Sequence, residues 1–475
     1  MEGRAHPKAT ELGPCCETQL SQPMPCAGST GRTWGDPGSW EGSWLPGGCC
    51  YRMPSPGLEI SADAIYRHVA EDVFAPRPET DIGLELEWIT SLPQDRARRI
   101  TLTEAEELTA LSAELPAGSS LSIEPGGQLE LATTPFESAA EVCDAAATDL
   151  FVLDQRCRAR DVELIALGVD PLKAPQRIVV HPRYQAMEAY FAQSSAAGRT
   201  MMCNTASIQL NIGFGGRQNL SRRWHTAHLL GPFLIATFAN SPFELGRPSG
   251  WVSTRMRTWW SVDSSRTAPP IRFGRDPVEV WADYALDARV MMVRASDTRY
   301  VPLGESMTFR QWLEHGHDLG WPTVDDFAYH LTTLFPPVRP RGWFELRVLD
   351  ALPTPFWHIA VAVTTALLAD ADLEDALHRA TSPSAGLWID SARSGLAHPA
   401  LQRTAADCFE LAIESLQRNH ADSATVALAS RYLDHFIRRG RCPADDRLDA
   451  WRRDGRLHPP PESPLPLEEM ESAWV

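Results

Sequence analysis

The chain has 475 residues, enough for one large domain or two to three average ones. Its hydrophobic content of 43% and charged content of 22% are those of an ordinary globular protein. The formal net charge of −17 argues against nucleic acid as a partner, because phosphate binding needs a basic surface.

Lysine is nearly absent, and several familiar active-site motifs are absent with it. The only lysines are Lys8 and Lys173, so a phosphate-binding cation in the body of the protein must be arginine, histidine or a metal. No GxxxxGK[ST] loop, GxSxG elbow or HExxH motif occurs. The GFGG of residues 213–216 lacks the third glycine of a dinucleotide fingerprint. The sequence therefore excludes P-loop chemistry.

Both ends of the chain differ in composition from the segment between them. Residues 1–56 are rich in glycine, proline, serine and cysteine and have no sustained period, which predicts a disordered extension. We expect residues 442–475 to form a proline-rich, acidic tail. Between them, residues 57–441 alternate strand and helix patterns and are expected to form one folded domain.

The compartment is predicted from the missing membrane and disulfide signals. The first ten residues lack a hydrophobic signal core, and the longest apolar runs, residues 229–239 and 359–369, are too short to span a bilayer. The ten cysteines include no matched CxxC pairs. We expect a cytoplasmic protein with reduced thiols and no membrane partner.

Helical periodicity recurs along the body in chain order. The first helix is expected to begin at Thr103, which precedes Glu106 by the three residues of a capping box. Strands clustered in the first half and around residues 343–349, with helices elsewhere, predict an α+β fold with an antiparallel sheet. Further helices are predicted at 135–161, 221–240, 276–293, 323–335, 357–380, 403–417 and 423–439, with a short strand at 161–170.

Four strand-like segments share an unusual second face. Side chains alternate between the two faces of a strand, and in each segment one face is apolar. The other face carries acids and amides, with little of the lysine and threonine that solvated faces favour. In residues 120–132 a Gly-Gly turn joins two such strands. The polar-face residues are Glu85, Glu87, Glu124, Gln128, Glu130, Gln209, Asn211, Glu345 and Arg347.

Carboxylates gathered on one concave sheet face raise each other's pKa unless cations lie among them. Mg²⁺ suits such a face, because it prefers oxygen ligands and shares them with substrate phosphates. The alternative is an antiparallel sheet with one glutamate-rich face in water.

Arginines gather in two further stretches. Residues 241–266 contain Arg255 and Arg266 together with Trp259 and Asp263, and arginine binds carboxylates and phosphates bidentately. Residues 335–347 place three arginines beside Glu345, as phosphoryl transfer requires. The alternative for the first stretch is a loop with surface arginines.

These motifs resemble, in order, those of the plant and proteobacterial-type glutamate–cysteine ligases, and within that family they are most similar to actinobacterial enzymes of ergothioneine biosynthesis. The resemblance runs from about residue 58 to about residue 440, so residues 57–441 are expected to be the catalytic domain. The motifs are SIEPGGQLEL (122–131), NTASIQLNIGF (204–214), FANSPFELGRPSGWVSTRMRTWWSVDSSR (238–266) and HLTTLFPPVRPRGWFELRVLD (330–350).

The resemblance implies a glutamine-synthetase-like catalytic fold, in which an antiparallel sheet forms a bowl for Mg²⁺ and ATP with helices packed behind it. It implies that ATP phosphorylates the γ-carboxylate of glutamate and that the amine of cysteine then attacks. Arg347, Arg255 and Arg266 become the catalytic candidates. The implied metal ligands are Glu85, Glu87, Glu124, Glu130 and Glu345, and the implied substrate-binding residues are Gln209, Asn211, Arg255, Trp259, Asp263 and Arg266.

Two alternatives stay open at this point. A related carboxylate–amine ligase would phosphorylate glutamate but use another amine, and a catalytically silent relative would only bind nucleotide or glutamate. The partners expected are the small molecules glutamate, cysteine and ATP. The sequence does not indicate an oligomeric state.

Overall fold

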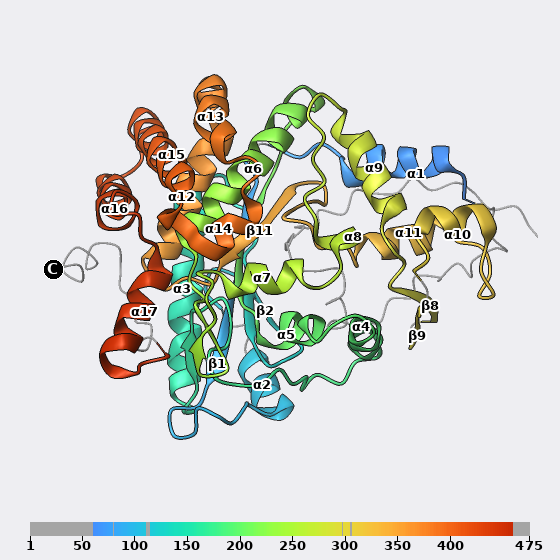
Figure 1. Cartoon of the computed structure of the whole chain (residues 1–475), viewed down its shortest axis with the longest axis horizontal. Helices are drawn as coiled ribbons and strands as arrows, with labels where there is room; N and C mark the ends of the chain where they lie inside the picture. The colour runs from blue at the N-terminus through green and yellow to red at the C-terminus, as the bar shows by residue number, and fades with distance from the viewer. Residues whose placement is uncertain (1–59, 79, 111–114, 297, 305, 459–475) are drawn as a thin grey trace, which may run out of the picture. The chain divides into compact units, whose positions relative to one another are not determined.

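The computed structural model describes residues 60–458, except residues 79, 111–114, 297 and 305 (Figure 1). The extension predicted for residues 1–56 lies outside the described residues, as does the tail from residue 459 onward.

An antiparallel sheet forms the centre of the domain. Its strands follow the order β10-β11-β5-β1-β3-β2, and β4 also pairs with β1. Two separate pairs, β6–β7 and β8–β9, complete the strands of the described part. The strands are β1 (Ile82–Ser91), β2 (Ser120–Ile123), β3 (Leu129–Ala132), β4 (Glu163–Ile165), β5 (Ser207–Ile212), β6 (Phe243–Glu244), β7 (Arg247–Pro248), β8 (Met292–Ser296), β9 (Arg299–Pro302), β10 (Val338–Pro340) and β11 (Phe344–Asp350).

The four polar-faced segments predicted from the sequence are all strands of this one sheet. Pairing of β1 with β3 sets Glu87 opposite Glu130, and pairing of β1 with β5 sets Glu85 opposite Gln209. Strand β11 lies on the other side of β5. Since every second side chain shares a face, the register collects the acids and amides on one surface.

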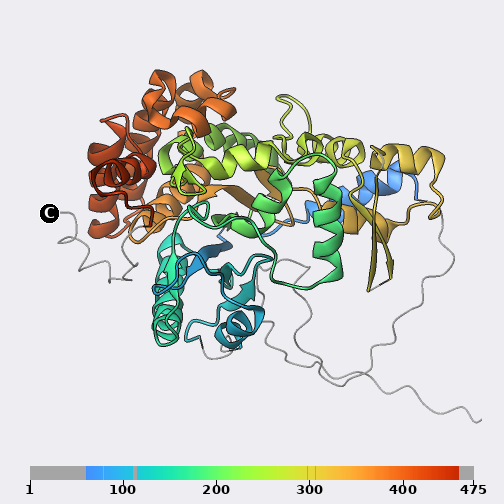
Figure 2. The same cartoon turned by 60° about the horizontal axis from the view of Figure 1, so that its bottom comes forward.

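Helices cover the opposite, apolar face. Leu84, Leu210 and Phe344 are fully buried there, and the ring of Trp224 on α6 lies 5.6 Å from that of Phe344. In Figures 1 and 2 the C-terminal helices gather on one side of the sheet, and α9 to α11 with the β8–β9 hairpin on the other. The prediction of an α+β fold with an antiparallel sheet and helices packed behind it is confirmed.

Each helix predicted from the sequence is present in the predicted order, although several bounds differ. Further helices that were not predicted lie between them. In chain order the helices are α1 (Ala62–His68), α2 (Leu102–Thr109), α3 (Ala139–Arg158), α4 (Pro182–Ala192), α5 (Ala197–Asn204), α6 (Arg217–Phe238), α7 (Thr254–Trp260), α8 (Ser264–Thr267), α9 (Pro277–Asp287), α10 (Phe309–His315), α11 (Val324–Leu331), α12 (Phe356–Ala369), α13 (Glu374–Thr381), α14 (Trp388–Ser394), α15 (Pro399–Arg418), α16 (Ser423–Tyr432) and α17 (Pro443–Asp454).

The predicted cap of the first long helix was wrong by two residues. Thr101 caps α2, and Glu104 closes the capping box. The stretch contains both spacings, and the earlier start puts Ala105 and Leu108 on the buried side of the helix.

Two predicted helices are shorter than expected. The segment 276–293 leaves the helix after Asp287 and enters strand β8, and the segment 357–380 breaks between α12 and α13. Within the described residues no single helix is long and apolar enough to cross a membrane; α12 and residues 371–384 pass that test only as a pair bent by 79°.

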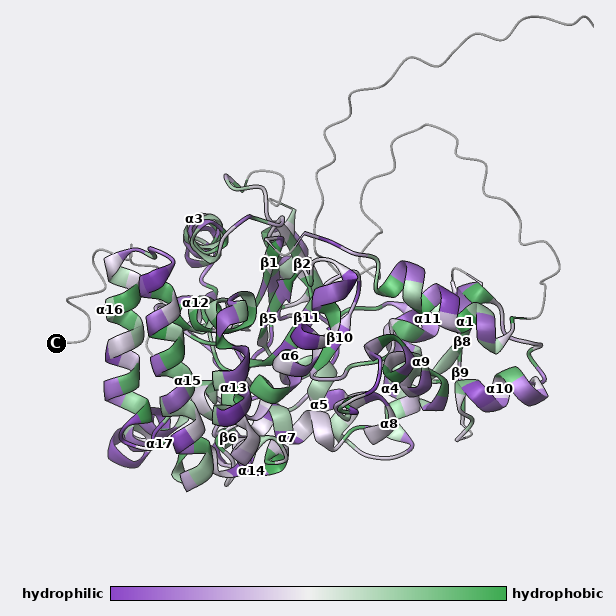
Figure 3. Cartoon of the chain, turned by 90° about the horizontal axis from the view of Figure 1, so that it is seen from above, coloured by the Kyte–Doolittle hydropathy of each residue, from purple (hydrophilic) through white to green (hydrophobic). Residues whose placement is uncertain are grey.

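The folded body extends past residue 441. Helix α17 lies inside the segment assigned to the tail, and it is anchored by the buried Cys442 and by a hydrogen bond from the Ala444 amide to the Ala239 carbonyl. Figure 3 shows the C-terminal helices striped with hydrophobic and hydrophilic residues, as expected when one side of each faces a core.

Candidate active site

A cavity of about 110 Å³ lies over the polar face of the sheet. Strands β1, β3, β5 and β11 form its floor, and helices α4, α5 and α7 form its walls. The lining residues are Glu85, Glu87, Glu124, Pro125, Gln128, Glu130, Arg183, Tyr184, Met187, Met201, Met202, Thr205, Ser207, Gln209, Arg255, Trp259, Phe335, Arg339, Arg341 and Arg347.

The glutamates on the cavity floor have too little positive charge around them to stabilise their ionised forms. Burial, together with the neighbouring Glu345, raises the pKa of Glu85 to about 8. Burial and then Glu85, Glu124 and Glu87 raise the pKa of Glu130 well above its usual range. Two buried acids with raised pKa values in one cavity are a functional-site signal.

Glu87 accepts more hydrogen bonds than Glu85, the other glutamate on the polar face of β1. Its carboxylate accepts hydrogen bonds from the Ser207 amide at 2.8 Å and from the Gln209 side chain at 3.0 Å. Burial raises its pKa, but Arg255 and Arg347 oppose that shift. Glu85 has a smaller set of hydrogen bonds, with Asn211 donating to it at 3.0 Å.

Glu345 has the opposite charge environment. Arg339 donates to both of its oxygens, at 2.7 and 2.9 Å, and Arg347 also donates to it. Although burial alone would raise it, these arginines hold the pKa of Glu345 well below its usual range. Its side chain is fully buried behind the arginines and does not line the cavity.

Arg347 and Arg255 are held above the floor. Arg347 also donates to Gln209, and its guanidinium lies 5.4 Å from the centre of the Trp259 ring. Arg255 donates to the Arg347 carbonyl at 2.8 Å, and burial lowers its pKa to about 10. Arg347 at the cavity edge and Arg255 behind it are therefore placed to bind an anionic group.

Arg266 and Asp263 lie outside the cavity. Arg266 is fully buried, pairs with Asp263 at 2.9 Å and donates to the carbonyls of Thr333 and Arg289. The Phe335 amide donates to the Arg266 carbonyl, so the pair helps to fix a lining residue. Direct contact of Arg266 or Asp263 with a substrate stays a prediction that this geometry does not favour.

Asn211 is also removed from the cavity lining. It is fully buried, donates to Glu85 and accepts from the Trp343 ring nitrogen at 2.9 Å. Its observed contacts are those of a residue that orients Glu85.

One wall of the cavity was not predicted from the sequence. Arg183, Tyr184 and Met187 come from α4, and Met201 and Met202 from α5. Neither helix was predicted, because neither stretch contains a long apolar period or a recognisable motif.

The Gly-Gly turn between β2 and β3 packs under α5. A Cβ at Gly126 would lie 2.1 Å from the Cys203 carbonyl oxygen, and Gly127 has φ +90°. Arg99 donates to the carbonyls of both Gly126 and Cys203. Glycine is therefore required at the turn both by close approach and by backbone angle.

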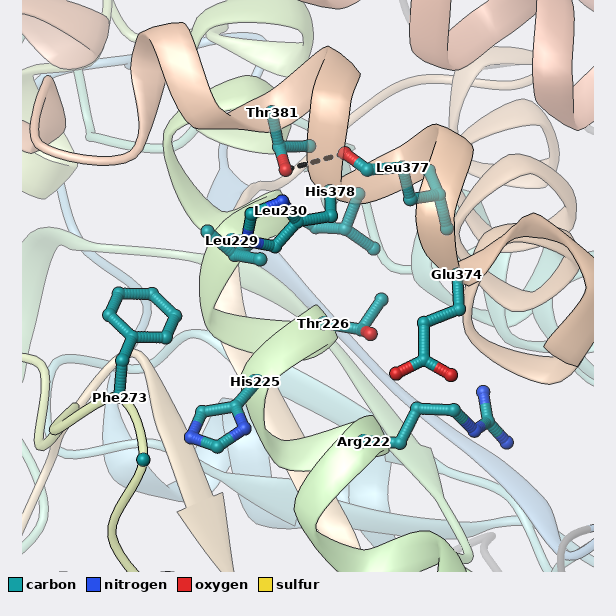
Figure 4. A pocket seen from close by; sticks show the side chains of 11 residues that line it. Arg222, His225, Thr226, Leu229, Leu230, Phe273, Glu374, Leu377, His378 and Thr381 are labelled. Atoms are coloured by element: carbon teal, nitrogen blue, oxygen red, sulfur yellow. Dashed lines mark hydrogen bonds between the residues drawn. The ribbon is translucent and has the colours of Figure 1, made fainter.

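Another cavity, of about 200 Å³, lies between α6 and α13 (Figure 4). Its lining includes Arg222, Glu374 and an imidazole, His225, stacked on Phe273 with ring centres 5.4 Å apart. Glu374 is the only carboxylate of that lining, so this cavity lacks the group of acids found over the sheet.

The donor chemistry of the sheet cavity fits a hard divalent cation. In the described part of the chain, no three Asp, Glu, His or Cys side chains converge closely enough to enclose an ion. Mg²⁺ does not need such a cage, since it keeps several waters and takes one or two carboxylates together with substrate phosphates. Glu85 and Glu130, whose charge is unbalanced, are the natural donors.

The antiparallel sheet with its covering helices has a counterpart among solved structures. A bifunctional glutathione synthetase from Pasteurella multocida has a similar fold, with a TM-score of 0.50 and 12% identity over 79% of this chain and 51% of that one. The family model of glutamate-cysteine ligase family 2 matches residues 81–462, and the chain belongs to that family.

Two relatives illustrate the similarity within the family. The chain is 38% identical to the glutamate–cysteine ligase EgtA of Mycolicibacterium smegmatis, over 82% of this chain and 91% of that protein. It is 29% identical to the chloroplastic glutamate–cysteine ligase of Arabidopsis thaliana, over 70% of this chain and 66% of that protein. The family resemblance seen in the motifs is thereby confirmed.

Proposed function

We propose that this protein joins L-glutamate to the amine of L-cysteine with consumption of ATP, giving γ-glutamylcysteine. Family membership and the EgtA similarity support the reaction. The observation that carries it is the cavity in which unbalanced buried carboxylates, Glu85 and Glu130, face arginines that reach the same space. We also propose that the product serves ergothioneine synthesis in the cytoplasm, as the motif resemblance indicates.

The chemistry divides into two balanced steps. A γ-carboxylate oxygen of glutamate attacks the terminal phosphorus of ATP, and ADP leaves. The cysteine amine then attacks the carbonyl carbon of the γ-glutamyl phosphate, loses a proton and expels inorganic phosphate. Both steps concentrate negative charge on phosphoryl oxygens, and stabilising that charge is where most of the rate enhancement arises.

The residues of this chain take the following proposed roles. Arg347 binds the transferring phosphoryl group, and Arg255, supported by Trp259, binds a substrate carboxylate. Gln209 fixes Arg347 and Glu87, because it hydrogen-bonds to both. The proposed Mg²⁺ ligands are Glu85, Glu87, Glu124, Glu130 and Glu345.

Bound Mg²⁺ would neutralise phosphate charge on the floor of the cavity. Glu345 differs from the other candidates, since Arg339, Arg341 and Arg347 already balance it. Its second proposed role is to hold those arginines in position.

Turnover with defined components tests the proposal. The purified protein is incubated with ATP, Mg²⁺, glutamate and cysteine, and ADP and the thiol product are measured by mass. ADP and γ-glutamylcysteine that depend on all four components support it. ADP release that needs glutamate but not cysteine would indicate another amine, and no ADP under any combination would contradict the proposal. A chelator should abolish turnover, and excess Mg²⁺ should restore it.

A further inference from the structure

One wall of the active-site cavity is made of thioethers. Met187 on α4 and Met201 and Met202 on α5 line it, and all three side chains are buried. They belong to a hydrophobic cluster that is separate from the main core. This separate cluster also contains Met291 and Met292. Five of the eleven methionines of the chain therefore lie in one small cluster.

Two polar groups beside this wall, Gln128 and Thr205, already have hydrogen bonds within the protein. The Gln128 amide donates to the Thr205 carbonyl at 2.8 Å and accepts from the Gly126 amide at 3.0 Å. The Thr205 hydroxyl donates to the Met201 carbonyl at 2.6 Å. A ligand group placed against the methionines meets polarizable sulfur and methyl groups and gains no new hydrogen bond from Gln128 or Thr205.

We infer that Met187, Met201 and Met202 form the subsite for the cysteine side chain and select a thiol over a hydroxyl. The inference rests on the proposed function. A thiol is a weak hydrogen-bond donor that packs well against thioethers. A serine hydroxyl would lose its hydrogen bonds to water without replacing them, which is unfavourable.

The alternative occupant of the wall is the adenine ring of ATP. Adenine presents nitrogen donors and acceptors along its edge, and Gln128 and Thr205 have their donors in use. The thiol side chain therefore suits this wall better than the base.

Competing amines test the inference. The specificity constant kcat/KM is measured for L-cysteine, for L-2-aminobutyrate, which has a methyl in place of the thiol, and for L-serine. We expect cysteine and 2-aminobutyrate to agree within about tenfold and serine to be at least about tenfold poorer, the range in which apolar pockets discriminate. The variants Met201→Gln and Met202→Gln should each lower the cysteine-to-serine ratio at least tenfold, because a glutamine amide can bond the hydroxyl.

Matched variants separate a subsite effect from a loss of structure. Met292→Gln changes the same cluster away from the cavity lining and should leave the ratio unchanged. Met201→Leu keeps an apolar side chain of similar volume and should preserve it. The KM values of ATP and glutamate should stay within threefold in all four variants.

Two results would overturn the inference. An unchanged cysteine-to-serine ratio in both glutamine variants would do so, and so would a rise in the KM of ATP alone, which would assign the wall to adenine. Calorimetric binding of 2-aminobutyrate separates this inference from the proposed function. If the wild type binds it at least fivefold more tightly than Met201→Gln but shows no turnover, the subsite stands and the ligase proposal fails.

Discussion

Two buried clusters of this protein pair a carboxylate with arginine but differ in their surroundings. Glu345 with Arg339 and Arg347 lies at the edge of the sheet cavity, and Asp263 with Arg266 lies at the N-terminus of α8 and within it. The guanidinium of Arg266 binds Asp263, the Tyr190 hydroxyl and the carbonyls of Thr333 and Arg289, away from the cavity. The first cluster adjoins Glu85 and Glu130, whose negative charge is not balanced. Residue types therefore do not reveal a binding site, whereas charge left unbalanced in a cavity does.

The largest expected effect comes from neutralising Glu130, which lines the cavity, or Glu345, which is buried beside it. Glu130→Gln and Glu345→Gln should each lower kcat by about a thousandfold or more, because both disturb the groups that stabilise phosphoryl charge. Glu130→Gln should leave the melting temperature nearly unchanged, since burial and the neighbouring acids raise the pKa of Glu130 and so already favour its neutral form. Steady-state kinetics measure kcat, and calorimetry measures the melting temperature. Near-normal rates in both variants would contradict the proposed roles of Glu130 and Glu345.

Arg347→Met should be nearly as damaging to catalysis. We expect kcat to fall about a hundredfold, since a charge-stabilising donor is lost from the cavity. Arg347→Lys should restore only part of the loss, because lysine lacks the planar bidentate fork. Equal rates for the wild type and the methionine variant would remove Arg347 from the mechanism.

Disrupting the Asp263–Arg266 cluster should lower the stability of the protein and leave its activity nearly unchanged. Arg266→Met leaves the buried Asp263 with only the partly exposed Arg289, at 3.1 Å, as counter-ion, which should lower the free energy of unfolding by up to about 3–5 kcal/mol. The kcat of the folded fraction should stay within threefold. Denaturant unfolding and active-site titration give the two quantities; a thousandfold loss of kcat without destabilisation would place Arg266 among the substrate-binding residues.

The smallest effect is the pH dependence of the Asp263 pair. Burial opposes ionisation, yet the charge of Arg266 and the hydrogen bonds from Tyr190 and Ser265 together outweigh burial and lower the pKa of Asp263. The stabilising contribution is therefore complete above the unfolded pKa near 3.9 and is lost as pH falls through the lower folded value. The difference in unfolding free energy between the wild type and Asp263→Asn should be constant from about pH 8 to 5 and shrink below about pH 4; a difference that grows on acidification would contradict the pairing.

Strand alternation was enough to predict the polar face of the sheet. Glu85, Glu87 and Glu130 were placed correctly because a side-chain period of two needs only local sequence. The pairing of Glu87 with Glu130 was not predictable, since it depends on register between strands about forty residues apart along the chain.

Burial separated residues that the sequence treated alike. Arg255 and Arg266 stand in one arginine-rich stretch, yet only Arg255 lines the cavity. The methionine wall was missed for a related reason. Met187, Met201 and Met202 are ordinary apolar residues in sequence, and only the packing of α4 and α5 over the sheet places them at the site.

The central claim is that the cavity over the sheet activates a carboxylate by phosphorylation. Glutamate labelled with ¹⁸O in its γ-carboxylate tests this most directly, with cysteine and ATP present and the released phosphate analysed by mass. The account predicts one ¹⁸O atom in each phosphate, because a carboxylate oxygen becomes the bridging oxygen of the γ-glutamyl phosphate. Phosphate without ¹⁸O, alongside formation of the peptide, would contradict it.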